Sequence, residues 1–261
     1  MLNTNNNYLL FIDCGDIILS KFCLLAIKDQ LDNNRTVDIY EWSWIDGDTG
    51  YVNGGNEPST PGKIYRREFL ESNNIYPYSQ GAGSYAAEDC GINISCYAII
   101  DDYKDVEETQ HIQYFELPIY KTVVNKNSLT FKDNKEFWYT AVPGIVDNGI
   151  YCISICEQAQ VHTDIILSKM NNFMIDLYTY FLRCVAKRPH LLESHWQQIR
   201  RFYLTTYKKY INLPENENYQ TIHFKQRMKG LFNYYPRPNL KRFIRELDEC
   251  ENLPTNYLTF S

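Results

Sequence analysis

The chain has 261 residues, of which 44% are hydrophobic and 22% are charged, so it can bury a core and is not an intrinsically disordered protein. Its formal net charge of −6 argues against general binding to nucleic acid, which needs a basic surface. No stretch approaches the roughly 20 apolar residues of a membrane span, and the first residues lack the basic segment and the apolar core of a signal peptide. We therefore expect a protein that does not enter membranes and is not secreted by a signal peptide.

The charge is distributed unevenly along the chain. Residues 1–156 contain 11 Lys and Arg against 22 Asp and Glu, a net charge of −11. Residues 157–261 contain 15 against 10, a net charge of +5. Opposite charges on two parts of a chain attract either within one molecule or between neighbours, and the sequence leaves both alternatives open.

The first part of the chain mainly shows the patterns of β-strands. Thr36 to Trp44 alternates with the two-residue period of a strand, and turn residues follow it at Asp46 to Gly50. Ile17 to Leu31 suits a buried strand or a helix. The other predicted strands are Tyr8 to Ile12, Ile92 to Ile100, His111 to Val124, Lys135 to Val142 and Gly149 to Cys156, with turns at Pro143-Gly144 and Asp147-Asn148-Gly149.

A long segment, residues 53–87, is rich in Gly, Pro, Asn, Ser and Tyr. We expect it to be irregular and to need another surface for packing, because it has little apolar material of its own and is too aromatic for a flexible linker. Tyrosine is favoured at contact surfaces between molecules. The predicted contacts with neighbouring molecules are Tyr65, Phe69, Tyr76, Tyr78 and Tyr85.

After Cys156 the pattern changes to that of helices. From Val161 to Ala186 apolar residues recur at steps of three and four, which predicts one long amphipathic helix that Pro189 ends. Further helices are predicted at Leu191 to Ile211, Thr221 to Phe232 and Asn239 to Glu249.

Strands followed by helices indicate an α+β fold. We expect an antiparallel sheet or sandwich in a mainly β portion, residues 1–156, with a mainly α portion, residues 157–261, packed on it as a helical layer in one compact domain.

No pattern in the sequence predicts a catalytic, metal or cofactor site. Gly81 to Ala86 has the spacing of a dinucleotide fingerprint, but Tyr76 to Gln80 before it is not the hydrophobic strand that such a site needs. The five histidines show no paired zinc-ligand spacing. We expect a protein that is not an enzyme and binds no cofactor. Catalysis by a Cys–His pair stays open, because its members need not be adjacent in sequence.

The helical half carries an alternative function. Its basic residues are interleaved with aromatic ones, a composition that suits single-stranded nucleic acid, although solvated faces of amphipathic helices show it too. The alternative is a nucleic-acid-binding subunit or an enzyme of a larger complex that uses this basic half. Its candidate residues include Arg200, Arg201, Lys208, Lys209, Arg227, Lys229, Arg237, Lys241 and Arg242.

The sequence Tyr114-Phe115-Glu116-Leu117-Pro118 resembles a stretch of the cypovirus polyhedrins. The whole chain, with its length, its 22 tyrosines and its two oppositely charged halves, is similar to the polyhedrin-like matrix proteins of insect-virus occlusion bodies. The basic cluster of baculovirus polyhedrins and a long N-terminal arm helix are missing from this sequence. The resemblance therefore favours the divergent nudivirus type within this group.

The resemblance implies a structural protein that assembles with itself into a protective crystal in the nucleus or cytoplasm of an infected cell. Its partners would be further copies of itself and the embedded virions, with no membrane and no nucleic acid. Such crystals dissolve in alkali, where tyrosine, with an ordinary pKa of about 10, and lysine, with one of about 10.4, both change charge. Thiols oxidise outside the cell, so we predict at least one disulfide in the mature crystal. Its candidate residues are Cys14, Cys23, Cys90, Cys96, Cys152 and Cys156.

Overall fold

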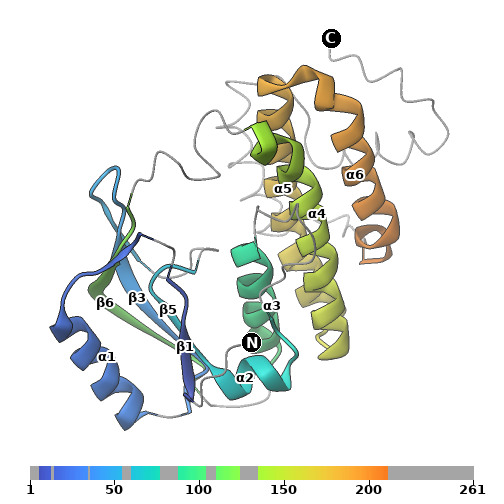
Figure 1. Cartoon of the computed structure of the whole chain (residues 1–261). Helices are drawn as coiled ribbons and strands as arrows, with labels where there is room; N and C mark the ends of the chain where they lie inside the picture. The colour runs from blue at the N-terminus through green and yellow to red at the C-terminus, as the bar shows by residue number, and fades with distance from the viewer. Residues whose placement is uncertain are drawn as a thin grey trace, which may run out of the picture.

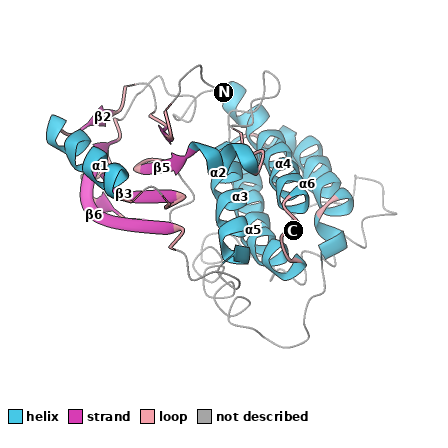
Figure 2. Ribbon diagram, turned by 90° about the horizontal axis from the view of Figure 1, so that it is seen from below, coloured by secondary structure: helices cyan, strands magenta, loops and turns pink. Residues whose placement is uncertain are grey.

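The computed structural model describes residues 6–12, 15–34, 36–54, 60–76, 88–103, 110–123 and 135–210. A β-sheet with one helix against it forms one side of the molecule, and a group of longer helices forms the other (Figures 1 and 2). The strands are β1 (Tyr8–Leu10), β2 (Ile17–Ile18), β3 (Ile39–Ile45), β4 (Val52–Asn53), β5 (Lys63–Arg66) and β6 (Ile112–Lys121). The helices are α1 (Lys21–Asn33), α2 (Arg67–Ser72), α3 (Glu88–Tyr103), α4 (Lys135–Gln158), α5 (Thr163–Lys187), the 3-10 helix η1 (Pro189–Leu191), α6 (Leu192–Thr205) and the 3-10 helix η2 (Tyr207–Tyr210).

The central strand of the sheet is β3. The strand order is β1-β5-β3-β6-β2, and β4 also pairs with β3. Most pairs are antiparallel, but β3 and β6 run parallel, so the sheet is mixed. Trp42 lies opposite Phe115, whereas Trp44 lies opposite Tyr120, so β6 has a bulge between these two positions. Pro118 sits in this bulge and cannot donate a ladder hydrogen bond.

Alternate residues of β3 face opposite sides of the sheet, as the geometry of a strand requires. Tyr40 and Trp42 belong to a hydrophobic cluster with residues of α1. Ile39 belongs to the larger cluster that includes residues of α3, α4, α5 and α6. The sheet is therefore covered by α1 on one face and by the helical group on the other, as Figure 1 shows.

In the helical group, α4 packs against α3, α5 and α6. The predicted stripe of α5 is buried in this group, with Met170, Met174, Leu177 and Phe181 fully enclosed. At Gly149 of α4 an added Cβ would lie 2.5 Å from Cζ of Phe173. This glycine therefore permits the close approach of α4 to α5.

The predicted α+β class, with an N-terminal sheet and helices after it, is confirmed. The sheet is mixed and not antiparallel as predicted, and α1, α2 and α3 lie between its strands in the sequence. The predicted strands at the start of the chain, at Thr36 to Trp44 and at His111 to Val124 correspond to β1, β3 and β6, and Val161 to Ala186 forms α5. Leu191 to Ile211 corresponds to α6 and its flanking 3-10 turns as far as Tyr210. The helices predicted at Thr221 to Phe232 and Asn239 to Glu249 lie outside the described residues.

The predicted strands Ile92 to Ile100, Lys135 to Val142 and Gly149 to Cys156 are wrong, because these residues form α3 and α4. Both helices are enclosed on several sides, so their apolar residues show no helical period, and the many Ile and Val residues resemble a strand. The turns predicted at Pro143-Gly144 and at Asp147 to Gly149 are also wrong, since both lie inside α4. The change from strands to helices therefore comes before Lys135 and not at residue 157.

The segment 53–87 is more regular than the sequence predicts. It contains β5 and α2, whose apolar residues Ile64, Phe69 and Leu70 are buried. Pairing of β5 with both β1 and β3 supplies the partner surface that the segment lacks on its own. Residues 55–59 and 77–87 lie outside the described part of the chain.

Candidate functional site

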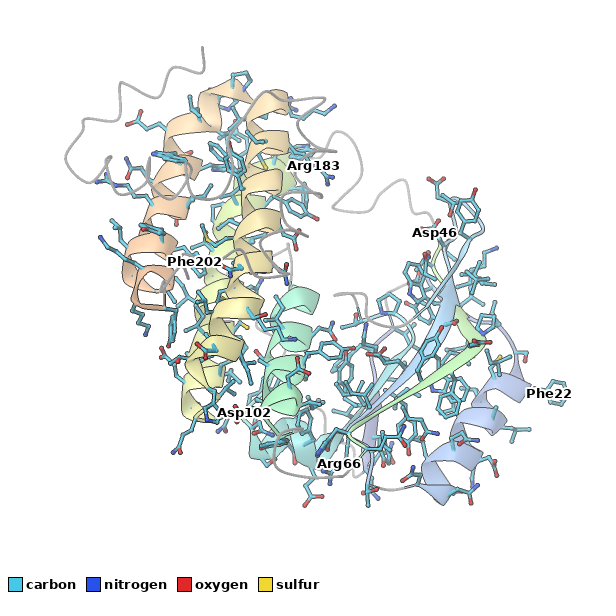
Figure 3. All side chains as sticks on the ribbon, turned by 180° about the vertical axis from the view of Figure 1, so that it is seen from behind. Phe22, Asp46, Arg66, Asp102, Arg183 and Phe202 are labelled. Atoms are coloured by element: carbon cyan, nitrogen blue, oxygen red, sulfur yellow. The ribbon has the colours of Figure 1, made fainter. Side chains whose placement is uncertain are left out.

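The first turns of α1 carry large apolar side chains that the sheet does not cover. Phe22 is 68% exposed, Leu25 58% and Leu24 51%. Figure 3 shows Phe22 projecting away from the molecule. Single exposed apolar residues are common on proteins, but three large ones within four positions of one helix are typical of a contact surface.

α1 packs its Cys23 and Ile27 face against the sheet, so Phe22, Leu24 and Leu25 lie on its other sides. The hydroxyl of Ser20 caps the helix by accepting hydrogen bonds from the backbone N–H groups of Phe22 (3.2 Å) and Cys23 (3.3 Å). Cys23 and Ile27, one turn apart, already occupy the face of α1 that packs against the sheet. The remaining apolar residues of the first turns are therefore left on the outside.

Two neighbouring segments extend this apolar area. The backbone N–H of Leu19 donates a hydrogen bond to the carbonyl oxygen of Ile119 (3.0 Å). The thiol of Cys23 donates a hydrogen bond to the carbonyl oxygen of Pro118 (3.9 Å). These contacts place α1 beside the bulge of β6, where Leu117 is exposed. We call the combined area the α1 surface, and its members are Ile17, Leu19, Phe22, Leu24, Leu25 and Leu117.

A buried charged cluster lies at the start of β3. The carboxylate of Asp38 accepts hydrogen bonds from Nε (2.9 Å) and Nη2 (2.6 Å) of Arg66, and its second oxygen lies 2.6 Å from Nδ1 of His111. Asp38 is only 1% exposed. The cluster joins β3, β5 and the residue before β6, and its burial indicates that it holds strands together.

A pocket of about 440 Å³ lies beside Arg66 and is also lined by Arg67, Glu68 and Glu71. Arg66 pairs with Glu68 (2.9 Å), and Arg67 lies 3.7 Å from Glu71. Because the positive and negative groups of this pocket neutralise each other, its charge selects neither an anionic nor a cationic ligand.

The described residues do not form a Cys–His catalytic pair. Burial is the main reason that the pKa of the Cys96 thiol is raised, with a smaller contribution from Asp38, and Cys96 is fully enclosed. His195 is buried in the helical group, where its Nε2 lies 2.9 Å from the carbonyl oxygen of Trp138, and burial lowers its pKa. A nucleophile needs a lowered thiol pKa and access to substrate, and Cys96 has neither.

Four candidate disulfide cysteines, Cys23, Cys96, Cys152 and Cys156, are buried free thiols in the structure, so none of them is joined to another. Cys14 and the side chain of Cys90 lie outside the described residues. The disulfide of the mature protein stays a prediction.

The predicted contact residues of segment 53–87 divide into three groups. Tyr65 and Phe69 are buried, so their prediction as contacts with neighbouring molecules is wrong; the hydroxyl of Tyr65 donates to Oδ1 of Asn93 on α3 (2.8 Å). Tyr76 is exposed and stays a candidate. Tyr78 and Tyr85 lie outside the described residues.

Basic residues of the helical half form ion pairs with acidic residues of the same molecule. Lys169 of α5 pairs with Asp101 of α3, and Arg201 of α6 pairs with Asp147 of α4. Both pairs join the acidic and the basic parts of the sequence, so part of the charge asymmetry acts within one molecule. Arg227, Lys229, Arg237, Lys241 and Arg242 lie outside the described residues.

The α1 surface is the feature of this chain that most clearly suggests a function. Within the residues that the structure describes, no group of three or more His, Cys, Asp and Glu side chains is placed to hold a metal ion. None of the described helices combines the length and the apolar character that crossing a membrane requires. No family model and no curated protein matches the chain.

Proposed function

We propose that this chain is a self-assembling structural protein, the matrix protein of a viral occlusion body, and that the α1 surface is one of its contacts between copies. The observation that carries the proposal is the exposure of Phe22, Leu24 and Leu25 on α1, a helix whose opposite face packs against the sheet. Burying such side chains removes apolar area from water, which favours association by about 25 cal/mol per Å². A protein that works as a monomer gains nothing from keeping them exposed.

The ion pairs of the helical half favour this proposal over the alternative. Arg201 and Lys169 are already paired with carboxylates of the same molecule. Lys209 likewise pairs with Glu157. Binding of phosphate groups there would have to compete with these pairs, which weakens the case for nucleic acid.

Release in alkali is the second part of the proposal, and it is supported by Tyr40, which is buried in the sheet, and by Tyr210, which is half-buried at the end of the helical group. Burial, followed by the neighbouring Tyr8, raises the pKa of Tyr40. Burial, followed by a hydrogen bond to Glu157, raises the pKa of Tyr210. Each of these groups is neutral in the folded chain at pH 7, and alkali strong enough to ionise it works against the fold. The proposed crystal would then dissolve as its subunits lose their packing.

The proposal is tested by producing the protein in insect cells and examining the cells by electron microscopy and diffraction. The natural chain is expected to form ordered particles, and Phe22→Glu should prevent them by placing a charge in the apolar contact. Tyr51→Glu is the control, because Tyr51 is also strongly exposed but lies at the turn after β3, away from α1. Soluble protein without particles from the natural chain at high yield would contradict the proposal, as would equal particle formation by Phe22→Glu.

A further inference from the structure

One ridge of α1 carries a charge at each end and an apolar residue at its centre. Lys21, Leu25 and Asp29 are spaced by four residues, so they follow one another along the same side of the helix. All three are exposed. With a rise of 1.5 Å per residue, Lys21 and Asp29 lie about 12 Å apart along the helix axis, with Leu25 midway between them.

The two outer charges are not neutralised within the described part of the chain. Lys28 forms an ion pair with Asp32 on the same helix. By contrast, Lys21 and Asp29 have no ion pair with any described residue, and the ammonium of Lys21 lies over the ring of Phe22, 5.4 Å from its centre. The ridge therefore offers one positive and one negative charge to a partner.

Lys21 is placed unfavourably with respect to the helix dipole. The N-terminal end of a helix favours negative charge and the C-terminal end favours positive charge. The first turn of α1 has no acidic residue and contains Lys21, while the last turn has no basic residue. A partner that brings a carboxylate to the first turn would compensate the charge of Lys21 at this end of the helix.

We propose that two copies of this chain pack α1 against α1 in antiparallel orientation, about a two-fold axis that passes close to Leu25. This inference rests on the proposed self-assembly and names the geometry of one contact. In this arrangement Lys21 of each copy faces Asp29 of the other copy. The Leu25 side chains meet at the centre, with Phe22 of both copies beside them.

Charge decides between the two possible orientations. A parallel pair would set Lys21 against Lys21 and Asp29 against Asp29, and both contacts are repulsive. The antiparallel pair turns both into attractive contacts and brings the carboxylate of Asp29 to the first turn of the partner helix, where the dipole favours negative charge. A two-fold axis also makes the contact self-complementary, as isologous dimers require.

The test is a charge exchange, measured as the dissociation constant of the purified chain by analytical ultracentrifugation at low salt. Lys21→Asp and Asp29→Lys are each expected to weaken association about tenfold, because each creates two repulsive contacts per dimer. The double variant, which carries both changes on every chain, should regain affinity to within about threefold, because each pair is restored with reversed sign. Asp48→Lys, in the turn after β3, is the control and should leave the constant unchanged.

A second readout locates the axis. Leu25→Cys should form a disulfide between two copies under mild oxidation, whereas Leu24→Cys, on the flank of the helix, should not. If the natural chain associates and the single charge variants have the same dissociation constant, the antiparallel arrangement is overturned, but self-assembly is not. Natural chain that stays monomeric would overturn self-assembly itself. Chemical cross-links from α1 to residues 211–261 of the same chain would show that this segment covers the α1 surface. Such cross-links would also overturn the antiparallel pairing of α1.

Discussion

The hydroxyl of Tyr40, on the central strand β3, donates a hydrogen bond to the backbone carbonyl oxygen of Asn34, the C-cap residue that follows α1. Tyr40 is fully buried between Tyr8, whose ring meets it edge-on at 5.7 Å, and Phe115, whose ring stacks on it at 6.2 Å. One phenolic group therefore joins the core of the sheet to the helix that carries the α1 surface. Its neutral form is the one that the fold requires.

This relationship predicts a loss of stability in alkali. The pKa of Tyr40 is raised in the folded chain, mainly by burial. The stability that neutral Tyr40 contributes is therefore complete below about pH 10, the ordinary pKa of tyrosine in the unfolded chain. This stability is lost as the pH rises from there through the pKa of the folded chain. Tyr40→Phe should cost about 1 kcal/mol at pH 7, because the Asn34 carbonyl loses its donor, and should flatten the decline above pH 10. Urea unfolding between pH 7 and pH 11.5 measures both effects. Tyr51→Phe is the exposed control, and a decline equally steep in Tyr40→Phe and in the natural chain would refute the assignment.

The buried cluster at Asp38 predicts a large effect from a small change. Asp38→Asn keeps the shape of the side chain but leaves the partly buried guanidinium of Arg66 with only the exposed Glu68 as a carboxylate partner. We expect the free energy of unfolding to fall by about 3 kcal/mol. Asp32→Asn removes the partner of Lys28 in an exposed pair and should change it by less than about 0.5 kcal/mol. Denaturant titrations at pH 7 compare the two, and similar values for both would show that burial of Asp38 contributes little.

Two helical glycines predict opposite outcomes for the same substitution. A methyl group at Gly149 would lie 2.5 Å from Cζ of Phe173 and 2.9 Å from Cε2 of Phe202, so Gly149→Ala should lower stability by about 1–3 kcal/mol. At Gly91 of α3 the nearest atom would be 3.5 Å away, so Gly91→Ala should raise stability by up to about 1 kcal/mol through helix propensity. The midpoints of thermal unfolding of both variants, compared with that of the natural chain, test the two predictions. A gain at both positions would mean that α4 and α5 do not pack as closely as described.

The sequence predicts those elements whose two faces differ. Both faces of β3 are buried but carry different residues, since Tyr40 and Trp42 meet the cluster around α1 and Ile39 meets the helical group. α5 has one apolar stripe because its polar residues, among them Asp164, Asp176 and Arg183, lie on the exposed side. α3 and α4 could not be recognised in this way, since residues such as Ile99, Ile100 and Val146 are buried on several sides of their helices. Gly149, which sequence reasoning assigns to a turn, instead serves close helix packing.

The α1 surface could not be predicted for a related reason. An apolar run such as Phe22 to Leu25 indicates burial, and the sequence alone does not show that Cys23 and Ile27 are the residues that take the face against the sheet. The same ambiguity applies to Tyr65 and Phe69, whose burial depends on β5 pairing with β1 and β3. These outcomes depend on partners that lie far apart in the sequence.

The measurement that tests the central claim most directly is sedimentation equilibrium of the purified chain at pH 7 over a hundredfold range of concentration. We predict that the average mass of the natural chain rises above that of one copy and that Leu25→Glu remains at one copy throughout, while Tyr51→Glu behaves like the natural chain. Both variants should show the circular dichroism of the natural fold, since both side chains are exposed. A natural chain that stays at the mass of one copy over the whole range would contradict self-assembly.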